Sequence, residues 1–70
     1  MTTDDLIQIV EAGAGLSIDA QTKTQEELMQ IVAAAVQADT TVRLRNAGGK
    51  KVEELLELAS QGRESIDFEL

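Results

Sequence analysis

Cysteine and histidine are absent from the 70 residues, and so are proline, tryptophan and tyrosine. Without cysteine or histidine, the chain has no thiolate nucleophile, no histidine-based triad, no disulfide framework and no Cys/His zinc site. Phe68 is the single aromatic residue, so a site built from a row of stacked aromatic side chains is excluded. We therefore expect a protein that is not an enzyme and that holds no metal and no cofactor.

Positive charge is scarce, because six Lys and Arg stand against 13 Asp and Glu, a net charge of −7. This balance repels nucleic acid and anionic membrane surfaces. The longest purely apolar run, residues 31–36, is far shorter than the ~20 residues that span a bilayer. The acidic residues 4 and 5 stand where a secretory signal carries positive charge. We expect an acidic, soluble, cytoplasmic protein without nucleic-acid or membrane partners.

A short motif occurs three times along the chain. Residues 5–10 (Asp-Leu-Ile-Gln-Ile-Val) reappear as residues 27–32 (Glu-Leu-Met-Gln-Ile-Val) and, more loosely, as residues 54–59 (Glu-Leu-Leu-Glu-Leu-Ala). Each copy is followed by a segment in which the hydrophobic period changes from 3.6 to 2. The sequence therefore predicts a single domain of three helix-strand units, which are residues 1–20, 21–46 and 47–70.

The three predicted helices carry apolar residues at helical spacing, which predicts one buried stripe on each. The stripes are Leu6, Ile9 and Val10; Leu28, Ile31, Val32 and Ala35; and Val52, Leu55, Leu56 and Ala59. Thr24 and Glu27 have the spacing of a capping box at the start of the middle helix. Gly13, Gly15 and Gly62 are available for the left-handed conformation that ends a helix, and the middle helix should end near residues 38–39.

Strands separated by helices should pair in parallel with right-handed crossovers. We predict an α/β fold with a three-stranded parallel sheet in the order 1-2-3, all helices on one face, and the other face polar and exposed. The apolar strand residues should face the helices: Leu16, Ile18, Ala20, Val42, Leu44, Ile66, Phe68 and Leu70. The polar ones should face away: Ser17, Asp19, Arg43, Arg45, Asp67 and Glu69.

Charge supports this strand order. With the second strand in the centre, its two arginines lie between Asp19 on one side and Asp67 and Glu69 on the other, and such cross-strand pairs are favourable. The orders 2-1-3 and 1-3-2 would separate the arginines from one acidic neighbour. They are therefore the less favoured alternatives.

The segment from Val42 to Gly48 followed by residues 52–59 resembles the leucine-rich-repeat class of β/α solenoids. In that class an asparagine follows the last strand leucine by three positions, whereas Asn46 follows Leu44 by two. The resemblance is one of architecture. It implies that the open face of the sheet is a surface for binding a partner.

The loop after the second strand is a candidate anion site, because it lies at the carboxyl end of a parallel strand and offers uncovered amides at a helix start. The candidate ligand-binding residues are Lys23, Asn46, Gly48, Gly49, Lys50 and Lys51. The loop lacks the spacing of a Walker motif. The same residues also fit a plain βα turn whose glycines supply permissive dihedral angles.

The function that we expect is a noncatalytic module that binds another protein or itself, as a homodimer, because a core of this size gains stability from association. The predicted interaction face consists of Asp19, Arg43, Arg45, Asp67, Glu69, Phe68 and Leu70. The alternative is a domain that binds a small phosphate-bearing or other anionic molecule at the Gly48–Lys50 loop. A third alternative is a subunit whose function exists only within a larger complex.

Overall fold

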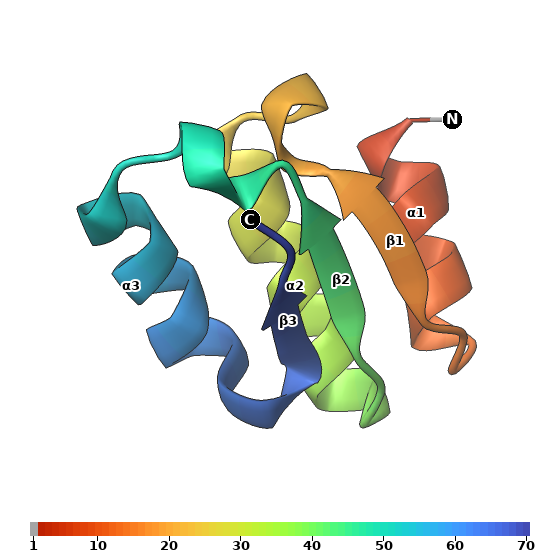
Figure 1. The fold of residues 1–70 in the computed structure, drawn as a ribbon. Helices are drawn as coiled ribbons and strands as arrows, with labels where there is room; N and C mark the ends of the chain where they lie inside the picture. Colours follow the sequence, from red (N-terminus) through yellow and green to blue (C-terminus); the bar gives the residue numbers. More distant parts are fainter. Residues whose placement is uncertain (1) are drawn as a thin grey trace.

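Residues 2–70 are described by a computed structural model, in which helices and strands alternate along the chain (Figure 1). The helices are α1 (Thr3–Glu11), α2 (Gln25–Ala38) and α3 (Val52–Gly62), and the strands are β1 (Leu16–Asp19), β2 (Val42–Arg45) and β3 (Ile66–Phe68). Three short 3₁₀ helices complete the chain: η1 (Ala20–Thr22), η2 (Ala47–Gly49) and η3 (Arg63–Ser65). The strands pair in parallel in the order β1-β2-β3, which confirms the predicted α/β fold and strand order.

All three helices pack on one face of the sheet, and the other face is bare (Figure 1). In β2, Val42 and Leu44 are completely buried whereas Arg43 and Arg45 are exposed, as the alternation of the sequence predicted. The core is almost entirely aliphatic. Its largest fully buried side chains are Leu28, Ile31, Leu44, Leu58, Val10, Val32 and Val42.

A capping box at the start of α2 also ties α1 to α2. The Thr24 hydroxyl accepts a hydrogen bond from the Glu27 amide (3.2 Å), and the Glu27 carboxylate accepts one from the Thr24 amide (2.9 Å). The other Glu27 oxygen accepts a hydrogen bond from the Thr3 hydroxyl of α1 (2.7 Å). These hydrogen bonds, first that from the Thr24 backbone, lower the pKa of Glu27. The predicted capping box is confirmed.

The ends of the helices follow the predicted glycines only in part. Gly13 takes a φ of 99° just after α1, and α2 ends at Asp39, which is left-handed with a φ of 55°. Gly62 was predicted to be a left-handed residue, and this prediction was wrong. It is buried and right-handed (φ −88°), and the next residue, Arg63, has the positive φ of 51°.

Two residues of the predicted buried stripe of α3 are exposed, and so is Leu70, which was predicted both to face the helices and to lie in the interaction face. Val52 and Leu56 on α3 are 70% and 64% exposed, and Leu70 is 84% exposed. Leu58 of the same helix is completely buried instead and Leu55 is half-buried, so the inward face of α3 is turned relative to the predicted stripe. The physical reason is position: α3 covers the last strand of the sheet, and no described element packs on its outer side.

Candidate functional site

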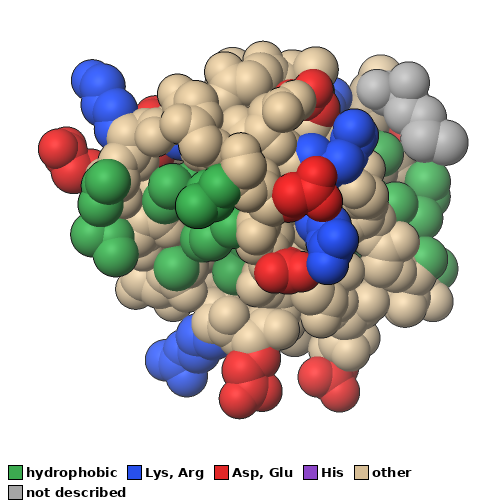
Figure 2. Space-filling model, viewed as in Figure 1, with side chains coloured by type: hydrophobic (Ala, Val, Ile, Leu, Met, Phe, Trp, Pro, Cys, Tyr) green, Lys and Arg blue, Asp and Glu red, His purple; other side chains and the backbone are tan. Residues whose placement is uncertain are grey.

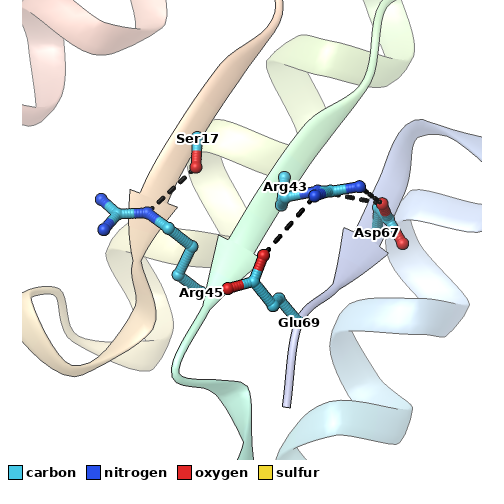
Figure 3. A network of polar contacts seen from close by, with 5 residues as sticks. All are labelled: Ser17, Arg43, Arg45, Asp67 and Glu69. Carbon is cyan, nitrogen blue, oxygen red and sulfur yellow. Dashed lines mark hydrogen bonds and ion pairs between the residues drawn. The ribbon is translucent and has the colours of Figure 1, made fainter.

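The bare face of the sheet carries an ion-pair ladder between β2 and the end of β3. Arg43 lies directly opposite Asp67 in the register, and its guanidinium contacts Asp67 at 2.9 Å and Glu69 at 3.5 Å (Figure 3). All three side chains are about half exposed, so the ladder is solvated. Half of the predicted charge pairing is therefore formed on the β3 side of β2.

The predicted pairing on the β1 side is absent. Asp19 and Arg45 are opposite each other in the register, but the Arg45 Nε donates to the Ser17 hydroxyl (3.0 Å), and Figure 3 shows its side chain turned toward β1. Asp19 accepts hydrogen bonds from the Gln21 amide (2.8 Å) and from the Asn46 side chain (2.9 Å). The Asp19 carboxylate therefore organises the loops at the carboxyl ends of β1 and β2 rather than neutralising an arginine.

The predicted anion loop forms the turn η2 and packs against Gln21 and Leu70, although Gly48 and Gly49 themselves stay exposed. The backbone of Leu70 lies so close to Gly48 that a β-carbon there would be 3.2 Å from the Leu70 carbonyl oxygen, and a β-carbon at Gly49 would be 2.5 Å from the Gln21 side-chain nitrogen. The Gly49 amide donates to the Asn46 carbonyl (3.3 Å), and the Lys50 amide donates to the Ala47 carbonyl (3.0 Å). Two of the amides that an anion would use are thus already bonded within the turn.

The lysines of the predicted anion site do not share one target. The Lys50 ammonium donates to the Gln25 side-chain oxygen (3.0 Å), which ties η2 to the start of α2. Lys51 is the N-cap of α3, and its amide donates to the Glu54 carboxylate (3.1 Å). Lys23, just after η1, contributes to the lowered pKa of Glu27 through its charge. Of the three ammonium groups, that of Lys50 is held by a hydrogen bond within the fold, and Lys51 is bonded through its backbone amide.

A different surface stands out, and we call it the β3–α3 surface. It combines the free edge of β3 with the exposed apolar side of α3 and consists of Val52, Leu56, Asp67, Phe68, Glu69 and Leu70. Figure 2 shows hydrophobic side chains gathered on this side of the molecule, where α3 lies beside β3. Exposed apolar side chains gathered on one side of a small protein are a candidate for a binding surface.

Other features of the described residues are less specific. A shallow hollow near the end of the sheet where β2 and β3 begin is lined by Val36, Asp39, Gly62, Arg63, Glu64 and Ser65. Among residues 2–70, no three carboxylates lie close enough to hold a metal ion together. No helix in this part of the chain has the length and apolar character needed to cross a membrane.

Comparison of the chain with protein-family models, with curated proteins and with solved structures gives no match. The resemblance to leucine-rich-repeat solenoids therefore stays a prediction about architecture.

Sequence reasoning placed Asp67, Phe68, Glu69 and Leu70 in the interaction face but missed Val52 and Leu56. Their spacing predicts an inward stripe and therefore a place in the core. The missed signal is the width of the stripe: with Leu58 included, apolar residues cover more of α3 than one buried face requires. The residues beyond the buried face, Val52 and Leu56, are therefore left exposed.

Proposed function

We propose that this chain is a noncatalytic module that binds another protein through the β3–α3 surface, and that it works in the cytoplasm. The observation that carries the proposal is the exposure of Val52 (70%) and Leu56 (64%) beside β3, which has no neighbouring strand on its outer side among residues 2–70. Burial of such side chains against a partner contributes favourable free energy at about 25 cal/mol per Å². While they are exposed to water, these side chains add no free energy of burial to the stability of the domain.

The geometry supports binding rather than chemistry. The ion-paired side chains of the sheet face, Arg43, Asp67 and Glu69, are half exposed and bonded to each other, and the pKa of Glu27 is lowered by hydrogen bonds that belong to a helix cap. A catalytic acid or base needs a raised or otherwise tuned pKa within a pocket. The β3–α3 surface instead offers an apolar centre with charged neighbours, as binding interfaces do.

The test compares two charge substitutions in the native host. A tagged chain carrying Leu56→Glu should lose the protein that co-purifies with the wild-type chain, whereas the matched variant Gln8→Glu, on the exposed side of α1, should retain it. Circular dichroism should show both variants folded. Equal recovery of the partner by the wild-type chain and by Leu56→Glu would contradict the proposal.

A further inference from the structure

The backbone of β3 has one bonded side and one free side. The Glu69 amide donates to the Leu44 carbonyl (2.8 Å), and the Glu69 carbonyl accepts from the Ala47 amide (3.1 Å), so both groups of Glu69 point toward β2. These groups alternate in direction along a strand. The amide and carbonyl of Phe68 therefore point away from β2, to the free edge. This edge can accept the hydrogen bonds of one more strand.

The space beside this edge is bounded by an apolar wall. Val52 and Leu56 of α3 and Leu70 after β3 are the exposed apolar side chains there, and Phe68 is half-buried next to them. In Figures 1 and 2, α3 extends past the outer side of β3 and carries hydrophobic side chains there. A strand added to β3 would place its inward-facing side chains against this wall, as β2 places Val42 and Leu44 under the helices.

The opposite face of the same edge is acidic. Asp67 and Glu69 project from the bare face of the sheet and share a single cation, Arg43 of β2. Two carboxylates for one guanidinium leave an excess negative charge on the outer side of β3. The whole chain, with its net charge of −7, adds a long-range attraction for a basic segment.

We propose that the β3–α3 surface binds an extended segment of a partner protein in which apolar and basic residues alternate, and that this segment pairs with β3 as a fourth strand. This inference rests on the proposed function and names the chemistry of the partner. Strand β2 already has the alternating pattern that we propose for the partner. Its apolar residues Val42 and Leu44 face the core, and its basic residue Arg43 lies opposite Asp67. Addition of a strand to a free sheet edge is an established mode of peptide binding.

A second copy of this chain fits the edge less well. In an antiparallel pair centred on Phe68, Asp67 of each copy would lie opposite Glu69 of the other copy. Parallel addition to β1 of another copy, in the register of this sheet, would bring Glu69 beside Asp19. Like charges directly opposite each other across strands are destabilising, and each copy carries a net charge of −7. Charge therefore selects a basic segment over self-pairing.

The probe is a capped peptide of sequence Val-Arg-Leu-Arg-Val-Arg, titrated into the full chain labelled with ¹⁵N. Saturable amide shifts are expected at Phe68, Leu70 and Leu56. Hydrogen exchange of the Phe68 amide should slow by about tenfold or more, because it gains a partner. The Glu69 amide, which already has one, should change little.

Three variants and two control peptides make the test specific. Asp67→Asn combined with Glu69→Gln should weaken binding by about tenfold, as should Leu56→Glu, while Gln8→Glu should bind like the wild type. A peptide with glutamate in place of arginine, and one with the three arginines grouped together, should bind more weakly than the alternating peptide. Binding should also weaken as salt is added.

Equal binding of the alternating and grouped peptides, or no slowing of exchange at Phe68, would overturn the fourth-strand inference. A dimer in light scattering, with shifts at the same residues and no added peptide, would overturn it in favour of a second copy. In either case the co-purification test with Leu56→Glu remains independent. If Leu56→Glu loses the native partner and the peptide does not bind to the wild-type chain, the proposed function stands and the proposed chemistry of the partner is wrong.

Discussion

Gly62 lies so close to Val32 that a β-carbon at position 62 would be 2.7 Å from a Val32 methyl carbon. Ile66 of β3 is equally near, with two of its side-chain carbons at 2.8 and 2.9 Å from the same point. Gly62 thus allows the last turn of α3 to approach α2 and β3 together. The close approach, and not a left-handed conformation, explains glycine at this position.

Gly62→Ala should therefore destabilise the fold, by about 1–3 kcal/mol for an overpacked core site. The matched control is Ser60→Ala, an exposed position of the same helix, which should change the free energy of unfolding by less than about 0.5 kcal/mol. Urea unfolding followed by far-ultraviolet circular dichroism suits a chain without tryptophan or tyrosine. Equal stability of the wild type and Gly62→Ala would contradict the packing argument.

The backbone strain of this arrangement lies at Arg63. It has a φ of 51° and a ψ of −112°, a region that a β-carbon disfavours and that glycine enters freely. Arg63→Gly should raise the free energy of unfolding by about 0.5–1 kcal/mol, because relief of the strain exceeds the added entropy of the unfolded chain. Arg63→Ala keeps the β-carbon and should give no such gain, so equal effects of the two variants would refute the strain.

The same two positions show where sequence reasoning succeeds and where it stops. A glycine near the end of a helical pattern predicts the end of α3, but packing against two other elements decides which residue takes the positive φ. Helix α3 is a second example. Its broad apolar stripe, which includes Leu58, Val52 and Leu56, predicts a helix but does not fix how that helix is rotated about its own axis. That rotation depends on how many elements pack around the helix, which is a property of the whole fold.

The strand order, by contrast, was accessible from the sequence. Period-2 alternation separated the two faces, and the position of acidic residues on either side of the arginines favoured the order that the structure has. The side chains of the bare face were harder to predict because several partners compete there. Asp19 has the register position of an arginine partner but bonds to Asn46 and the Gln21 amide instead.

Glu27 should make stability depend on acid pH. Its pKa is lowered in the folded state by hydrogen bonds from the Thr24 backbone and from the Thr3 and Thr24 side chains. Its contribution to stability is therefore complete above the pKa of the unfolded chain and is lost as the pH falls through the lower pKa of the folded state. Glu27→Gln should flatten this part of the curve of unfolding free energy against pH. Glu26→Gln, an exposed neighbour, should retain the slope, and identical curves for both variants would argue against the role of Glu27.

The loop of Gly48 and Gly49 should not bind phosphate. The Gly49 and Lys50 amides are already bonded within the turn, and the Leu70 backbone and the Gln21 side chain lie close beside the two glycines. Titration of inorganic phosphate or a nucleotide into the ¹⁵N-labelled chain should therefore give no saturable shift at either glycine. Saturable shifts there that vanish in Lys50→Ala would instead support the small-molecule alternative.

The two arginines of β2 should differ in their coupling to the neighbouring strands. Arg43 contacts Asp67 directly at 2.9 Å, whereas Arg45 donates to Ser17 and has no ion pair with Asp19 among the described residues. Double-mutant cycles of urea unfolding measure each coupling free of the other effects of the substitutions. We expect about 0.2–1 kcal/mol for Arg43 with Asp67, a solvated cross-strand pair, and a value near zero for Arg45 with Asp19. The first coupling should shrink as salt is added, because both side chains are half exposed. Equal couplings for the two pairs would mean that register alone sets the ion pairs, and that the turned side chain of Arg45 does not persist in solution.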